Sequence, residues 1–166
     1  MNRLCIGLSL LSLFCCDAQA ETPRFVALPA RALPVIATVD LVVVGSGEGG
    51  LGAAYAAGKA GARVIVISDY TFLGDEYIAK AKRDLAAGPA PHSEMARELF
   101  AKPDPTEYSK AASRLLREAG VTFLDNSRYA GILVNAGGAL CGIATANKAG
   151  VQAIVCWTVA SPGVVF

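Results

Sequence analysis

The sequence has little of what usually marks a protein that binds nucleic acid or an acidic membrane surface. Its 166 residues include 15 Lys and Arg against 14 Asp and Glu, which gives a formal net charge of +1. No run of Lys or Arg forms a basic patch. This balance gives no electrostatic reason to expect nucleic acid or an anionic lipid surface as a partner.

Long apolar runs are equally scarce. Residues 4–16 form an apolar run, which is shorter than the ~20 residues that a transmembrane helix needs. Arg3 precedes this run, and Ala18 and Ala20 follow it at the spacing that a signal peptidase requires. The sequence therefore predicts a signal peptide over residues 1–20, export to the periplasm or the extracellular space, and no stable membrane span.

Few cysteines remain once the signal peptide is removed, namely Cys141 and Cys156. They are too far apart for a C-x-x-C pair and, with one histidine in the chain, they predict no metal site. Their positions are symmetric about a predicted turn at Lys148 and Ala149, so a hairpin there would place them opposite each other. Two alternatives stay open, a disulfide in an oxidising compartment or two small buried hydrophobic residues.

Signatures of acid–base and nucleophilic catalysis are absent as well. His92, the single histidine, stands in a Pro-rich loop, which favours a surface role over general-base chemistry. Ser46 lacks the G-x-S-x-G setting of a hydrolase nucleophile. The sequence therefore identifies no catalytic residue, and these residues remain unknown at this point.

The informative part of the sequence begins at Asp40. Residues 41–44 are a continuous apolar run, typical of a strand covered on both faces, and they lead directly into a G-x-G-x-x-G string at residues 45–50. An Ala-rich stretch up to residue 60 and a second β-rich run at residues 63–67 follow. Strand, glycine turn, thin helix and second strand together predict a dinucleotide-binding βαβ unit.

Three glycines of this string stand at positions where a dinucleotide-binding turn has no room for a side chain. Gly45 permits a tight turn, Gly47 lets the backbone approach a pyrophosphate, and Gly50 allows close contact between helix and strand. The start of the following helix would present N–H groups and the positive end of its dipole to the phosphates. The string therefore predicts where a dinucleotide would bind.

The carboxylate that binds the ribose in such units lies ~20 residues after the glycines. Asp69 lies at this distance, but alignment on residues 61–64 puts Ser68 at the usual acidic position. We predict that Asp69 meets the ribose, with a hydroxyl contact from Ser68 as the alternative. Neither position carries a basic side chain, which argues against a bound 2′-phosphate.

The flanking segments predict further elements of an α/β domain. Residues 21–39, interrupted by three prolines, predict an extended leader before a domain at residues 40–166. Two capped helices are expected, one from Ser93 to residue 101 and one from Asp104 to Gly120. A parallel strand at residues 121–124 should follow, and then three β-rich runs, listed as residues 129–134, 140–146 and 152–159.

These motifs resemble the FAD-dependent oxidoreductases. The resemblance rests on residues 40–50, on residues 61–67 and on Phe72-Leu73-Gly74, and it extends in weaker form to about residue 165. It is nearest to exported bacterial members of largely unassigned substrate. The resemblance implies a glutathione-reductase-type Rossmann-like fold, which is an α/β domain with a parallel sheet and an antiparallel β-meander inserted after the third strand. It also implies that the domain is incomplete at its C-terminus.

The resemblance also implies a cofactor and its contacts. FAD would bind with its pyrophosphate surrounded by Gly45, Gly47 and Gly50, with Gly49 alongside. Gly74 would lie in the loop beneath the flavin or the pyrophosphate. Asp75 and Glu76 stand where relatives have polar residues near the flavin ring, although a solvated acidic loop is an equal alternative.

Three functional hypotheses remain open. The first is the N-terminal FAD-binding portion of an exported oxidoreductase that acts on an unknown small molecule, because the substrate domain that the resemblance implies is absent from the sequence. The second is an NAD(P)-binding reductase domain. The third is a non-catalytic nucleotide-binding module, either a fragment or a degenerate relative.

Overall fold

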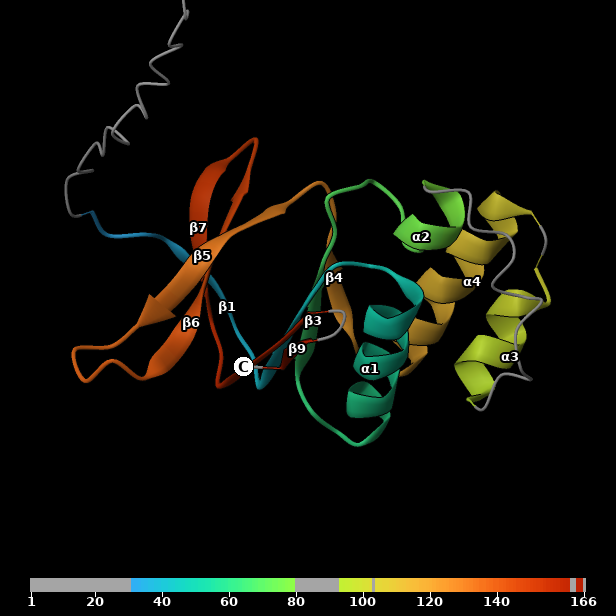
Figure 1. The fold of residues 1–166 in the computed structure, drawn as a ribbon, viewed down its shortest axis with the longest axis horizontal. Helices are drawn as coiled ribbons and strands as arrows, with labels where there is room; N and C mark the ends of the chain where they lie inside the picture. Colours follow the sequence, from blue (N-terminus) through green and yellow to red (C-terminus); the bar gives the residue numbers. More distant parts are fainter. Residues whose placement is uncertain (1–30, 80–92, 103, 162–163, 166) are drawn as a thin grey trace, which may run out of the picture. The chain divides into compact units, whose positions relative to one another are not determined.

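A computed structural model describes residues 31–79, 93–102, 104–161 and 164–165 (Figure 1). Ala32–Phe166 forms one compact unit. The predicted signal peptide and His92 lie outside the described residues. Among the residues that are described, no helix is long and apolar enough to cross a membrane.

The centre of the fold is the predicted parallel sheet. Its strand order is β4-β3-β2-β8-β9, in which the first four strands are parallel and β9 is antiparallel to β8. The strands are β2 (Leu41–Val44), β3 (Val64–Ile67), β4 (Thr122–Leu124), β8 (Thr158–Ser161) and β9 (Val164–Val165). Helix α1 (Glu48–Lys59) connects β2 to β3, so the predicted βαβ unit is confirmed.

Both faces of this sheet are covered, which explains why its strands are continuous apolar runs. Along β3, Val64 and Val66 pack among the helices, whereas Ile65 and Ile67 pack against a second sheet. Because successive side chains of a strand point to opposite faces, one run of four apolar residues serves two separate cores. Helices, parallel sheet and second sheet therefore form three layers (Figure 1).

The helical layer follows the predicted capping signals. Helix α3 (Glu94–Phe100) begins after Ser93, whose Oγ accepts a hydrogen bond from the N–H of Ala96 at 3.1 Å. Helix α4 (Pro105–Glu118) begins after Asp104, whose carboxylate accepts from the N–H groups of two first-turn residues at 2.9 and 3.1 Å. Gly120, with a φ of +74°, follows the end of α4 as predicted.

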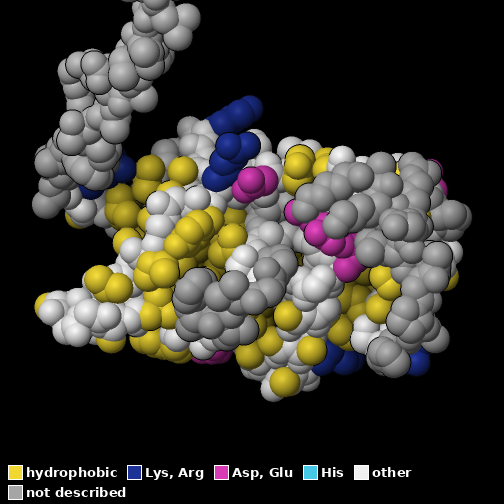
Figure 2. All heavy atoms as spheres, viewed as in Figure 1, with side chains coloured by type: hydrophobic (Ala, Val, Ile, Leu, Met, Phe, Trp, Pro, Cys, Tyr) yellow, Lys and Arg dark blue, Asp and Glu magenta, His cyan; other side chains and the backbone are white. Residues whose placement is uncertain are grey.

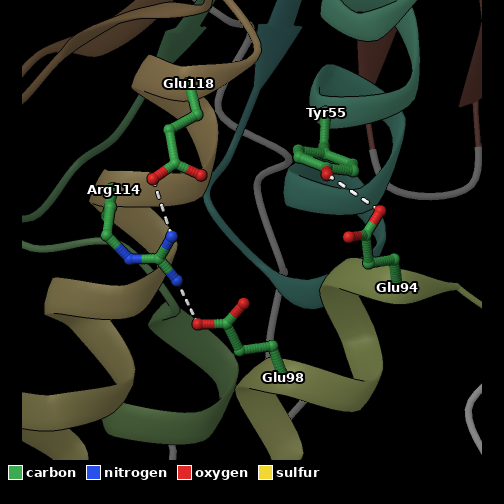
Figure 3. Close-up of polar contacts among 5 residues, drawn as sticks. All are labelled: Tyr55, Glu94, Glu98, Arg114 and Glu118. Atoms are coloured by element: carbon green, nitrogen blue, oxygen red, sulfur yellow. Dashed lines mark hydrogen bonds and ion pairs between the residues drawn. The ribbon is translucent and has the colours of Figure 1, made fainter.

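Side-chain contacts attach α3 to its neighbours (Figure 3). Arg114 of α4 pairs with Glu98 of α3 and, at 2.7 Å, with Glu118 one turn along its own helix. Tyr55 of α1 donates a hydrogen bond to Glu94 at 3.3 Å. These contacts are exposed, so their contribution to stability is small, and the buried Met95 and Leu99 anchor α3 instead.

The second sheet contains the predicted meander and one unexpected strand. Its order is β1-β7-β6-β5, with β5, β6 and β7 antiparallel and β1 parallel to β7. The strands are β1 (Val35–Thr38), β5 (Arg128–Val134), β6 (Leu140–Asn147) and β7 (Gly150–Val155). Residues 35–38, which the sequence assigned to an extended leader, are thus part of the fold.

Two neighbouring chain segments cross from one sheet to the other together. Thr38 pairs with Val155 in the second sheet, and Leu41 pairs with Thr158 in the parallel sheet. The number of residues between the two partners is the same in both pairs. The segment from β1 to β2 and the segment from β7 to β8 therefore run side by side where they pass from the second sheet to the parallel sheet. The predicted single strand at residues 152–159 is therefore wrong, because the chain changes sheets at Cys156 and Trp157.

The hairpin register confirms the predicted symmetry of the two cysteines. Gly142 pairs with Val155, and the N–H of Cys156 donates to the carbonyl of Cys141 at 3.4 Å. Both thiols are free, and Cys156 is buried. Burial, and next the nearby Cys141 thiol, raise the pKa of Cys156. The structure thus contains no disulfide between them; Cys156 packs as a buried hydrophobic residue, whereas Cys141 is only half-buried.

Exposed apolar side chains concentrate on the second sheet and the crossing. Figure 2 shows hydrophobic atoms gathered over this part of the molecule. The large hydrophobic residues exposed there are Val35, Ile36, Tyr129, Ile132, Val134 and Trp157. Trp157 is 62% exposed, so it is not a core residue.

Candidate functional site: the β2–α1 glycine turn

The glycine string forms the turn between β2 and α1. Gly45 has a φ of +97°, and its N–H donates to the carbonyl of Ile67 at the end of β3. A Cβ on Gly50 would lie 2.6 Å from the carbonyl oxygen of Gly45, too close for any side chain. Both glycines are therefore required by the backbone itself, as the sequence predicted.

The start of α1 is open for an anion. The first residue of the helix is Glu48, and the preceding Gly47 makes no side-chain cap. The N–H of Leu51 bonds to the carbonyl of Gly47, so the N–H groups before it have no partner within the helix. Gly49 is exposed, and a Cβ there would meet nothing within 4 Å. This end of the helix is an anion-binding position.

The loop that carries Gly74 is fixed to the glycine turn. The N–H groups of Gly74 and Asp75 donate to the carbonyl of Ser46, at 2.9 and 3.3 Å. Gly74 has a φ of +95°, and a Cβ there would lie 2.4 Å from a ring carbon of Tyr108. The structure therefore brings Gly74 together with the glycine turn, in contact with the ring of a residue on α4.

Ser68 is placed for structure rather than for ligand contact. Its side chain is fully buried, and its Oγ lies 3.0 Å from the Oγ of Ser46. The Ser68 hydroxyl also donates to the carbonyl of Phe72 and accepts from the N–H of Tyr70, each at 3.2 Å. Its hydrogen-bonding capacity is used inside the protein, which leaves none for a ribose.

Asp69 is placed for ligand contact. It follows β3 directly, at the carboxyl edge of the parallel sheet, and its side chain is 54% exposed. The Nε of Arg128 lies 3.7 Å from its carboxylate, and that arginine is itself 78% exposed. Since an exposed ion pair of this length is weak, the carboxylate remains accessible to a hydroxyl group. Of the two ribose candidates, the geometry favours Asp69.

Glu48 is the residue of this site that sequence reasoning did not single out. Its Oε1 accepts hydrogen bonds from the N–H of Tyr77 at 3.1 Å and from the hydroxyl of Tyr108 at 3.2 Å. Its Oε2 is buried, with no hydrogen-bond partner among the described residues. An acidic residue at a variable position of G-x-G-x-x-G gives no signal of these contacts, because Tyr77 and Tyr108 lie 29 and 60 residues away along the chain.

The acidic residues after Gly74 are not a solvated loop. They begin a one-turn helix, α2 (Asp75–Ile78), and are half-buried. A Cβ on Gly47 would lie 3.0 Å from Oδ1 of Asp75 and 3.2 Å from Cγ of Glu76, so α2 approaches the glycine turn closely. The Oδ1 atom of Asp75 is buried without a hydrogen-bond partner among the described residues. Three carboxyl groups therefore converge beside the turn.

Burial changes the proton affinity of this group of side chains. Desolvation, and next the neighbouring Glu76, raise the pKa of Glu48 above its usual value, although its hydrogen bonds oppose that shift. Desolvation and the charge of Glu48 also raise the pKa of Tyr108, so the phenol stays protonated and donates. Tyr108 is completely buried and stacks on Tyr77, with 4.5 Å between ring centroids.

The backbone of the site fits a dinucleotide. The turn is open at Gly49, the helix N-terminus supplies donors, and Asp69 lies at the end of the neighbouring strand, whereas Gly47 is buried against Asp75 and Glu76. In the part of the chain that the structure describes, no three His, Cys, Asp or Glu residues are arranged to hold a metal ion. The turn carries acidic side chains on one flank.

Comparison with known proteins agrees with this geometry. A family model described as FAD dependent oxidoreductase matches residues 40–81, which include the turn, Asp69 and Gly74. This segment is similar to the FAD-dependent oxidoreductase family. The resemblance inferred from residues 40–74 is thereby confirmed, and FAD is the cofactor that the family name gives.

Similar proteins extend the likeness beyond this segment. A thiamine thiazole synthase from Aeropyrum pernix is 34% identical, over 58% of this chain and 43% of that protein. The crystal structure of THI4 from Thermovibrio ammonificans is 20% identical over 74% of this chain, with a TM-score of 0.51. A flavocytochrome c3 fumarate reductase in an open conformation is 19% identical over 76% of this chain, with a TM-score of 0.56.

The two structural likenesses confirm the α/β fold class. The chain spans 43% of the length of the thiamine thiazole synthase, 56% of the THI4 chain and 34% of the fumarate reductase. It therefore corresponds to part of each of these proteins.

Proposed function

We propose that this chain binds FAD at the β2–α1 turn and serves as the cofactor-binding part of an oxidoreductase. The observation that carries the proposal is the turn itself, where Gly45 and Gly50 are required by the backbone and Gly49 is open to solvent. The match of residues 40–81 to FAD-dependent oxidoreductases supports FAD over a nicotinamide cofactor.

The residues that would hold FAD follow from the site. Gly45, Gly47, Gly49 and Gly50 would face the pyrophosphate together with the N–H groups of α1. Asp69 would accept hydrogen bonds from the adenosine ribose. Gly74 would lie on the other flank of the turn, since its N–H is fixed to Ser46. When bound, FAD supplies hydride and electron transfer, and the protein contributes binding and orientation.

Adding one methyl group at Gly49 tests this proposal. Gly49→Ala is expected to weaken FAD binding by about tenfold or more, because the methyl group occupies the open face of the turn where a pyrophosphate would approach. The protein should still fold, since the new Cβ meets no neighbour within 4 Å. The measurement is a titration of the purified full chain with FAD, followed by flavin fluorescence.

Gly52→Ala is the matched control. Gly52 lies three residues further along α1 and also has nothing within 4 Å of an added Cβ, but it is beyond the first turn of the helix. Its FAD affinity should equal that of the unmodified chain. Equal affinities for both variants would contradict the proposed phosphate position, and binding of NAD without FAD would favour a nicotinamide-dependent reductase instead.

We also propose that the protein is exported. The support is the sequence of residues 1–20, an apolar run after Arg3 that ends in Ala-Gln-Ala. When residues 1–166 are expressed in a Gram-negative bacterium, the protein should accumulate in the periplasm. Mass spectrometry of that protein should give the mass of a chain whose first residue is Glu21. A Leu10→Arg variant, which places a charge within the apolar run, should remain in the cytoplasm at full length. Full-length cytoplasmic protein from the unmodified gene would refute export.

A further inference from the structure

The charge beside the glycine turn is opposite to what a pyrophosphate needs. Glu48 is the first residue of α1, and Asp75 and Glu76 of α2 approach the same turn. Carboxylates at a helix N-terminus complement the helix dipole, but they repel a bound phosphate at the same place. A fall in this local negative charge would therefore strengthen the binding of a dinucleotide with two phosphate charges.

Among the described residues, no Lys or Arg makes a hydrogen bond or an ion pair with Glu48. Helix α2 contributes Asp75, Glu76 and the N–H of Tyr77, and α4 contributes the hydroxyl of Tyr108. On the side of α3, a small cavity of about 40 Å³ separates Glu48 from mostly apolar residues, among them Met95 and Leu99. Of the described residues, no Lys or Arg lines this cavity. A proton taken up from solvent would remove the charge of Glu48.

We propose that Glu48 positions α2 against the glycine turn and takes up a proton from solvent when a dinucleotide pyrophosphate binds. This inference rests on the proposed FAD site. In its neutral form Glu48 still accepts the hydrogen bonds of Tyr77 and Tyr108, so α2 keeps its place while the repulsion disappears. Since a nearby anion favours the neutral form of a carboxyl group, burial and the bound phosphate act in the same direction.

The sign of the pH dependence follows from this linkage. A ligand whose binding takes up a proton binds more weakly as the pH rises, by at most about tenfold per pH unit for each proton. The affinity of the unmodified chain for FAD, measured from pH 5.5 to 8.5, should therefore fall as the pH rises, with the decline beginning above the usual carboxyl range. Glu48→Gln keeps the amide oxygen as an acceptor for Tyr77 and Tyr108 but has no charge to lose.

The experiment measures FAD dissociation constants across this pH range for three proteins. The unmodified chain should show the decline, Glu48→Gln should lose at least half of its slope and bind FAD several-fold more tightly at pH 8, and Glu107→Gln should behave as the unmodified chain does. Glu107 is the matched control, because it lies in the first turn of α4, is exposed, and pairs with Lys110. Calorimetry of the unmodified chain in two buffers of different ionisation enthalpy should show net proton uptake.

Each outcome has a distinct meaning. An unchanged slope in Glu48→Gln, or calorimetry without proton uptake, overturns the role of Glu48 while FAD binding stands. Weaker binding by Glu48→Gln at every pH with the original slope would indicate a purely structural role, and overturns the proposal too. Failure of all three proteins to bind FAD at any pH overturns the proposed function and this inference with it. The calorimetric measurement needs no variant, so it can still overturn the proposal if Glu48→Gln does not fold.

Discussion

Tyr108→Ala is expected to lower the free energy of unfolding by about 3–5 kcal/mol, the usual cost of truncating a large buried aromatic side chain. Tyr108 has no exposed surface, stacks on Tyr77, and lies against Gly74. Truncation leaves a cavity at the junction of α2 and α4 and removes the hydroxyl that donates to Glu48. The measurement is urea unfolding followed by far-UV circular dichroism, because the single tryptophan is exposed and reports poorly on the core.

Tyr108→Phe separates the ring from the hydroxyl. It keeps the stacking on Tyr77 and the contact with Gly74, and it removes one hydrogen bond to a carboxyl group, which costs roughly 1–3 kcal/mol. A smaller loss for Tyr108→Phe than for Tyr108→Ala would show that the ring is the main contributor. Equal losses would mean that the hydroxyl–carboxyl contact, rather than the packing, holds α4 to the glycine turn.

Gly58→Ala is the second substitution with a large expected effect. A Cβ at Gly58 would lie 2.5 Å from the carbonyl oxygen of Ala119 and 2.6 Å from a methyl group of Val121, so α1 or the segment after α4 must move. Overpacking of this kind typically costs about 1–3 kcal/mol, which exceeds the ~1 kcal/mol that alanine gains over glycine within a helix. We expect a net decrease in the free energy of unfolding, measured in the same urea titration.

Gly52→Ala gives the opposite sign within the same helix. An added Cβ there has open space, so only the gain in helix propensity remains, up to about 1 kcal/mol. The two substitutions are chemically identical, and only the neighbours of each position differ. If both stabilised the protein, the close contact between α1 and the end of α4 would be refuted.

The βαβ unit could be predicted because its signals are local. The strand at residues 41–44, the glycine turn and the helix that follows lie within about 20 consecutive residues. Gly45 and Gly50 are required by the backbone of this same short segment. The caps at Ser93 and Asp104 were predicted for the same reason, since a cap bonds to N–H groups two or three residues ahead.

Elements that depend on distant partners were missed. Strand β1 has no periodicity of its own, and its four residues become a strand by pairing with β7, more than a hundred residues later. The division of residues 152–159 between two sheets depends on the same crossing, in which β1–β2 and β7–β8 run together. A continuous β-rich run contains no local mark of the place where the chain leaves one sheet for the other.

The sequence by itself, through its G-x-G-x-x-G string between two apolar runs, determined the βαβ unit and its glycine turn, and its small net charge gave no electrostatic reason to expect nucleic acid as a partner. The tertiary structure decided which residues can serve that unit. It buried Ser68 within internal hydrogen bonds, left Asp69 accessible, and brought Glu48, Asp75 and Glu76 to one turn. The physical reason is that burial and charge at a site are set by side chains that lie far apart along the chain and meet only in the folded protein.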